Sequence, residues 1–225
     1  QTNLKNTNMK TTFLKITALA TLIAFSSCKD KAEEAETKAA EAAAVAEATA
    51  VTYKADVDNS TIMWKGFKPT GSHTGTIKVK EGTVAVNDGT VESGNFTIDM
   101  GTIVVTDIPE DDEGNAKLQG HLSGPDFFDA KSHPTATFEI TGLETNDGKT
   151  MLSGNLTMKG ETNNISFPVK TSIDGDTMTL RSDTFTIDRS KWNVKYGSKS
   201  FFDDLGDKFI NDDIELTVNL VANKA

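Results

Sequence analysis

Two of the chain's three histidines, His121 and His133, share the stretch GHLSGPDFFDAKSHP with Asp126 and Asp129. Imidazole and carboxylate groups bind Zn²⁺ or act as general acids and bases, so this stretch is the first candidate for chemistry. Its spacing argues against such a site, because twelve positions and a proline separate the histidines, rather than one helical turn. We interpret the aspartates as turn-capping residues and the histidines as structural, with no metal bound.

Other patterns typical of enzymes and of nucleic-acid-binding proteins are missing from the sequence. The single cysteine, Cys28, lies near the start of the chain, and neither Gly-x-Ser-x-Gly nor His-Glu-x-x-His occurs. With 33 acidic against 23 basic residues the net charge is −10, which repels a phosphate backbone. We therefore expect no catalytic residues, no cofactor and no nucleic-acid partner.

Residues 9–28, MKTTFLKITALATLIAFSSC, are arranged like an export signal. Lys10 and Lys15 accompany the apolar run 16–25, which is too short to span a membrane, and small residues lead to Cys28. This arrangement resembles a bacterial lipoprotein signal, whose cysteine is lipidated. We expect residues 1–28 to comprise an upstream stretch and this signal, and Cys28 to be the lipidation site. The protein would then be a periplasmic or surface lipoprotein of the bacterial cell envelope, attached to a membrane.

Residues 29–51 differ in composition from the rest of the chain. They hold ten alanines in 23 positions, with glutamate and lysine and almost no bulky residue. Helix propensity is high, but no apolar stripe exists for burial. We predict an Ala/Glu-rich linker, semi-rigid or disordered, that acts as a stalk between the anchor and a folded domain at residues 52–225.

From residue 52 onward, apolar residues alternate with threonine and other polar residues, which predicts β-strands. Turn signals such as Asn87-Asp88-Gly89 separate the strands. Eight or more strands joined by hairpins indicate an all-β fold, a closed antiparallel barrel or a sandwich. Only segments 114–133 and 188–210 interrupt the alternation. In the first, Leu118 and Leu122 share one helical face, which predicts a short helical lid over a barrel end.

Aromatic residues occupy inward positions on several predicted strands, and the second interrupting segment adds more. They either fill a solid core or surround a cavity, since an eight-stranded barrel has just enough room for one small or slender ligand. The candidate ligand-binding residues are Trp64, Phe96, Phe138, Phe167, Phe185, Trp192 and Phe201.

Four motifs occur in one order: SGPDFFDAKSHPTATFEITGL, LSGNLTMKGETNNISFPV, SDTFTIDRSKWNV and INDDIELTVNLVA. Together they resemble the YceI-like family over residues 52–223. The resemblance implies an antiparallel lipocalin-like β-barrel whose long apolar tunnel binds a polyisoprenoid or other lipid-like chain outside the cytoplasm, for transport, storage or sensing. It also implies that Phe127 and Phe128 plug a barrel end. Lys159 stands where the family has a histidine, and Lys191-Trp192-Asn193 replaces its Asp-Phe-Gly.

Two alternatives remain open at the level of the sequence. The domain could be a membrane-tethered structural or interaction module whose barrel is packed solid and holds no ligand. A weaker alternative is a metal-dependent enzyme that uses His121 and His133. The sequence does not indicate an oligomeric state.

Overall fold

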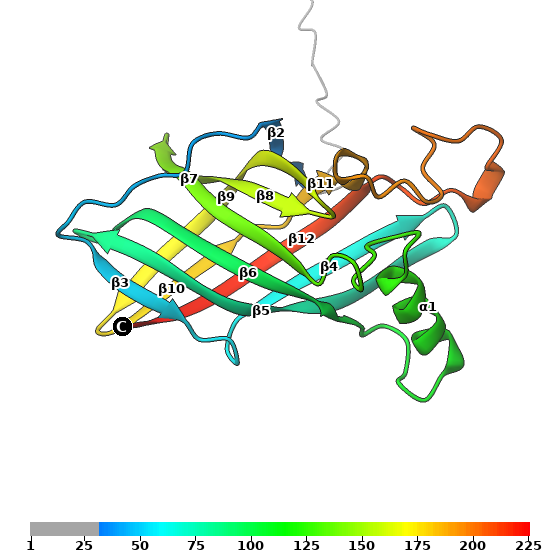
Figure 1. Ribbon diagram of the computed structural model, residues 1–225, viewed down its shortest axis with the longest axis horizontal. Helices are drawn as coiled ribbons and strands as arrows, with labels where there is room; N and C mark the ends of the chain where they lie inside the picture. The colour runs from blue at the N-terminus through cyan, green and yellow to red at the C-terminus, as the bar shows by residue number, and fades with distance from the viewer. Residues whose placement is uncertain (1–31) are drawn as a thin grey trace, which may run out of the picture. The chain divides into compact units, whose positions relative to one another are not determined.

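The computed structural model describes residues 32–225, so the predicted signal and Cys28 lie outside the described residues. Within residues 32–225 the chain forms twelve β-strands, one α-helix and two short 3₁₀ helices (Figure 1). The strands are β1 (Glu33–Glu34), β2 (Glu36–Ala39), β3 (Val51–Ala55), β4 (Thr61–Lys68), β5 (Gly71–Asn87), β6 (Thr90–Val105), β7 (Thr135–Asn146), β8 (Lys149–Met158), β9 (Glu161–Asp174), β10 (Thr177–Ser182), β11 (Phe185–Asp188) and β12 (Asp213–Lys224). The helices are α1 (Glu113–Ser123), η1 (Arg189–Trp192) and η2 (Gly206–Lys208). None of these helices is long and apolar enough to cross a bilayer.

Eight of the strands close into an antiparallel ring. Strands β5 to β10 pair in sequence order, β10 pairs with β12, and β4 closes the ring by pairing with both β12 and β5. Register shifts between β5 and β6, for example between Val79 and Glu81, mark β-bulges that bend these long strands around the barrel. The predicted all-β, closed antiparallel barrel of about eight strands is confirmed.

Helix α1 begins and ends as its sequence indicates. The Asp112 side chain accepts a hydrogen bond from the Gly114 amide at 2.7 Å, and the Gly124 amide donates to the carbonyl of His121 at 3.1 Å. Asn115 is buried, and its Nδ2 donates to the Val105 carbonyl at the end of β6. The predicted short helix is therefore present and fixed to one end of the barrel (Figure 1).

Residues 32–50 lie on the barrel and do not form the predicted linker. On β9, strand β10 pairs with residues 169–174 and does not reach residues 163–166. The backbone edge at residues 163–166 is therefore available, and β2 pairs with it. Strand β1 pairs in parallel with β11 at Phe185 and Thr186. An unpaired edge favours an extended segment over a helix, because it offers backbone donors and acceptors that only a strand can satisfy.

Side chains reinforce the seating of this segment. Ala35 is only 3% exposed, so its small side chain fits against the core. Asn155 accepts a hydrogen bond from the Glu41 amide at 3.0 Å and donates to the Glu41 carbonyl at 2.7 Å. The linker prediction for residues 29–51 is therefore corrected from residue 32 onward, and residues 29–31 lie outside the described residues. Residues 32–50 belong to the folded domain, which begins well before the predicted boundary at residue 52.

Candidate ligand-binding cavity

A cavity of about 360 Å³ occupies one end of the barrel. Its size falls within the range of roughly 300–1,000 Å³ that ligand pockets span. The strands contribute a largely apolar wall, formed by Ile62, Trp64, Ile77, Ile98, Met100, Ile103, Ala136, Leu156, Met158, Ile187, Ile214 and Leu216. Such a wall favours an apolar ligand, because it offers few hydrogen-bonding groups and a large hydrophobic contact area.

The strands border this cavity over only part of their length. Val91 and Ile98 on β6 are both buried in the core, but only Ile98 lines the cavity. On β12, Ile214 and Leu220 are likewise both buried, and only Ile214 lines the cavity. The barrel interior is thus hollow at one end and solid at the other.

Three of the predicted lipid-binding residues fill the solid end. The rings of Phe167 and Phe185 are stacked, with centroids 4.2 Å apart and planes 9° apart. Phe138 tilts against Phe167 at 5.7 Å. The Phe138 ring lies over Gly154, where an added Cβ would sit 2.3 Å from the ring, so the absence of a side chain at that position makes room for it. These rings form core contacts and do not line the cavity.

The other four predicted residues are divided between the cavity, the core and the surface. Trp64 lines the cavity. Phe96 is 8% exposed and packs in the core, and Trp192 is fully buried with its Nε1 donating to the Leu156 carbonyl at 2.9 Å. Phe201 is 46% exposed on the segment between η1 and β12. The structure therefore brings one of the seven predicted residues, Trp64, to the cavity wall.

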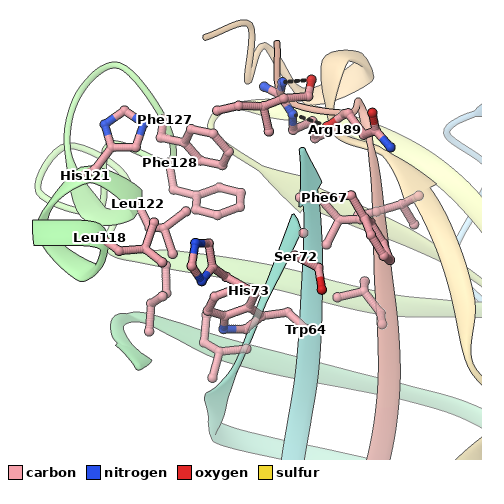
Figure 2. Close-up of a pocket in the computed structure, with 18 of the residues that line it drawn as sticks. Trp64, Phe67, Ser72, His73, Leu118, His121, Leu122, Phe127, Phe128 and Arg189 are labelled. Carbon is pink, nitrogen blue, oxygen red and sulfur yellow. Dashed lines mark hydrogen bonds between the residues drawn. The ribbon is translucent and has the colours of Figure 1, made fainter. Parts of the chain in front are cut away.

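Helix α1 and the turn after it supply one wall of the cavity. Leu118 and Leu122 line it from the helix, and Phe127 and Phe128 line it from the turn (Figure 2). The two phenylalanine rings meet edge to face with centroids 4.9 Å apart. Lys159 Nζ donates to the Phe127 carbonyl at 2.6 Å and so holds the turn against the barrel. This wall matches the predicted helical lid and aromatic plug.

Strands β4 and β5 supply another wall, where Trp64 is the largest side chain. Its indole lies over Gly75, and an added Cβ there would sit 2.4 Å from the ring. The indole Nε1 of Trp64 is buried and has no hydrogen-bond partner within residues 32–225. An unpaired buried donor costs free energy, and because protein atoms cover this nitrogen, Trp64 offers the cavity the apolar part of its ring.

His73 and His121 line the cavity. This position was not predicted from the sequence for either histidine. His73 Nδ1 lies 2.9 Å from Asp107 Oδ2, and the His121 ring lies 4.6 Å from the Tyr196 ring and 5.6 Å from the Phe127 ring. The interpretation of His121 as only a structural corner residue is therefore corrected. Within residues 32–225 no group of three or more His, Cys, Asp or Glu side chains is arranged to hold a metal ion.

Arg189 places a buried positive charge in the cavity wall. The guanidinium group donates to three backbone carbonyls, those of Asn211 at 3.1 Å, Val194 at 2.5 Å and Ile210 at 3.1 Å. Its Nη2 also lies 3.3 Å from Asp212 Oδ1, an ion-pair distance, although the geometry is not that of a hydrogen bond. Burial lowers the pKa of Arg189 while the charges of Asp212 and Asp188 oppose the shift, and the group stays protonated at neutral pH. Arg189 thereby fastens both ends of the segment 193–212 beside the cavity.

The environment of His121 predicts a pH-dependent stability. Burial lowers the pKa of His121, the charge of Lys68 lowers it further, and Asp126 opposes the shift. On acidification the unfolded chain therefore binds the proton first, at a pKa of about 6.5, so stability falls from there until the folded pKa is reached.

We expect the melting temperature of the wild type to fall more than that of His121→Gln between about pH 7.5 and about pH 5.5, a window around the ordinary histidine pKa of about 6.5. Thermal unfolding of both proteins across a pH series checks this. Equal slopes in the two proteins would show that His121 does not carry the effect.

Comparison with known proteins gives a family-level match over most of the described domain. The YceI-like domain matches residues 53–222. A UPF0312 protein of Pseudomonas aeruginosa (strain LESB58) is 35% identical over 65 residues, which cover 29% of this chain and 34% of that protein. The match thus spans about a third of the length of that curated relative.

Two solved structures share the fold. BcnA of Burkholderia cenocepacia aligns with a TM-score of 0.60 and 25% identity, covering 75% of this chain and 99% of that one. A polyisoprenoid-binding domain of Saccharophagus degradans, implicated in plant cell wall breakdown, aligns with a TM-score of 0.55 and 12% identity, covering 78% and 99%. The latter likeness, at so low an identity, concerns the fold alone.

Proposed function

This chain belongs to the family of YceI-like domains, and on that premise we propose that its barrel binds a lipid-like molecule, such as a polyisoprenoid, and catalyses no reaction. The observation that carries the proposal is the apolar cavity of about 360 Å³ at one barrel end. The polyisoprenoid-binding domain of the same fold supports it. Because a cavity of this size holds a drug-sized molecule, we expect a longer chain to extend past the rim.

The proposed contacts differ from those predicted by sequence alone. The apolar body of the ligand would lie between Trp64 on one wall and Leu118, Leu122 and Phe128 on the other. Transport, storage and sensing all begin with this binding step.

Native mass spectrometry after extraction in mild detergent tests the proposal. We expect a co-purifying lipid-like molecule bound to one barrel. An empty domain would favour the alternative, an interaction module without a ligand. The packed aromatic rings at the solid end of the barrel support that alternative. A stoichiometric metal ion would instead favour the metal-enzyme alternative.

We also propose that the protein is a lipoprotein of the bacterial cell envelope, attached to its membrane through Cys28, which lies outside the described residues. Labelled palmitate should enter the wild type, and Cys28→Ala should remain unlabelled and leave the membrane fraction or stall before export. Each buried CH₂ of an acyl chain contributes about 0.8 kcal/mol, so several chains hold a protein firmly. Cys28 is the only cysteine, and labelled Cys28→Ala protein would therefore contradict the proposal.

A further inference from the structure

The segment between η1 and β12, residues 193–212, presents aromatic side chains to solvent. Tyr196 is 47% exposed, Phe201 is 46% exposed and Phe202 is 50% exposed. These are the only tyrosine, tryptophan or phenylalanine side chains of residues 32–225 with such exposure. Two consecutive exposed phenylalanines, with an exposed tyrosine on the same segment, indicate an interaction surface, because exposed apolar side chains gathered in one place favour contact with a partner.

We call Phe201 and Phe202 the tip of this segment, and the residues Ser198, Ser200 and Asp212 that support them its base. Hydrogen bonds within the base hold the tip in one conformation. The amides of Phe201 and Phe202 both donate to the Ser198 carbonyl, at 3.2 and 3.1 Å. The hydroxyls of Ser198 and Ser200 donate to the Asp212 carboxylate at 2.8 and 2.7 Å. Because the base is fixed by these bonds and by Arg189, the exposed rings are presented by a formed structure.

Lysines accompany the aromatic rings. Lys195 Nζ lies 4.8 Å from the centre of the Phe201 ring, and Lys199 Nζ lies 3.6 Å from that of Phe209. Residues 189–199 carry one arginine and three lysines and no acidic residue, in a chain whose net charge is −10. Exposed aromatic rings with adjacent long cationic side chains are typical of segments that lie at the membrane–water interface.

Acidic residues limit the electrostatic part of this contact. Asp203 and Asp204 follow the two phenylalanines directly, and Asp207 comes three residues later. With Asp212 they outnumber the three lysines of residues 193–212, so the segment has no net attraction to an anionic surface. Burial of the aromatic rings must then supply most of the contact energy, and the contact should depend little on the anionic lipid content.

The segment 193–212 lies beside the cavity, at the hollow end of the barrel. Ile210 and Asn211, at the end of the segment, line the cavity, and the Tyr196 ring contacts His121 in the cavity wall. Figure 1 shows the segment, in orange, projecting from the same end of the barrel as the β4–β5 hairpin. Insertion of the tip into a bilayer would therefore bring the cavity to the source of a water-insoluble ligand.

We infer that Phe201 and Phe202 insert into the interfacial region of a phospholipid bilayer and dock the hollow end of the barrel on the membrane. The contact goes beyond the ligand proposal, because it requires only the rings and lysines of this segment. A second copy of the chain or a protein partner at the same rings is the competing occupant.

A fluorescent probe at the tip tests the inference in the full-length chain. Cys28→Ser removes the single native thiol, and Phe202→Cys then takes the environment-sensitive label NBD. Ile173→Cys is the matched control, because Ile173 is also an exposed apolar residue but lies in β9 away from the cavity wall. Vesicles are made of phosphatidylcholine, alone or mixed with phosphatidylglycerol.

We expect NBD at position 202 to brighten several-fold and shift to the blue with both vesicle types, and lipids brominated in their acyl chains to quench it. NBD at position 173 should not respond, even though the chain co-sediments with the vesicles. A silent probe at 202 in sedimented protein would overturn the inference. So would brightening with rising protein concentration in the absence of vesicles, which would indicate contact between copies.

Two further readouts separate this inference from folding and from the ligand proposal. Phe201→Ser should reduce the response at position 202, and its melting temperature should stay near that of the wild type because the ring is half exposed. Mass spectrometry of the same labelled proteins reports their lipid content. An NBD response at position 202 in protein without bound lipid would support this inference and contradict the ligand proposal. Bound lipid without an NBD response at position 202 would support the ligand proposal and contradict this inference.

Discussion

Ala136→Trp is expected to abolish ligand retention and leave the barrel folded. Ala136 is 4% exposed, lines the cavity from β7 and pairs with Ile98 of β6. An indole at this position would enter existing empty space, so we expect less strain than the roughly 1–3 kcal/mol of overpacking in a filled core. Ligand retention should fall at least tenfold, which corresponds to about 1.4 kcal/mol of binding energy.

Ala222→Trp is the matched control for this change. Ala222 is fully buried on β12 and belongs to the solid end of the barrel. The same added indole should there overpack the core and lower the melting temperature strongly. The measurements are lipid content by mass spectrometry and thermal unfolding of lipid-free protein. Ligand retained at the wild-type level in Ala136→Trp would show that the cavity is not the binding site.

Phe167→Ala is expected to destabilise the domain by about 3–5 kcal/mol, as truncation of a packed aromatic residue does. Phe167 is 4% exposed and contacts the rings of Phe185 and Phe138. Its removal creates a new void in the solid end and leaves the cavity wall intact. Protein that is still folded at low temperature should therefore bind the wild-type amount of ligand.

Phe128→Ala, the same chemical change in the cavity wall, separates the two roles. Phe128 borders empty space, so truncation loses fewer contacts and should cost less than truncation of Phe167. It should instead weaken ligand retention. Urea unfolding and lipid content of both variants decide the matter. If Phe167→Ala alters the bound lipid with little loss of stability, the tunnel extends into the region that we describe as solid.

The fold was accessible from the sequence because its signals are local and repeated. Period-2 alternation and turn residues specify each strand pair, and the spacing of Leu118 and Leu122 before Gly124-Pro125 specifies the short helix. Residues 32–50 were not accessible in this way. Their composition favours a helix, but the free edge of β9 at residues 163–166 lies more than a hundred positions along the chain, and pairing with it overrides local propensity.

The cavity was accessible only in part. Alternation shows that Trp64 and Phe167 both point inward, but it does not show which of them faces empty space. That difference depends on neighbours on other strands, such as Gly154 beneath Phe138, which lets the ring stack fill one end. Arg189 was also missed. The available signal was that it is one of only two arginines in the chain and follows an apolar strand directly.

Because residues 32–50 pack on the barrel, they cannot act as a spacer, which limits the distance between the domain and a membrane that holds Cys28. As a free, fully extended stalk, the 23 residues of 29–51 would span up to about 80 Å. With Ala32 fixed to the domain, a lipid on Cys28 would be four peptide units away, or at most about 14 Å. If Cys28 carries the proposed anchor, the domain could not carry a ligand across an aqueous compartment. It would then exchange molecules with the leaflet that holds it, and any delivery elsewhere would depend on an acceptor that comes to that surface.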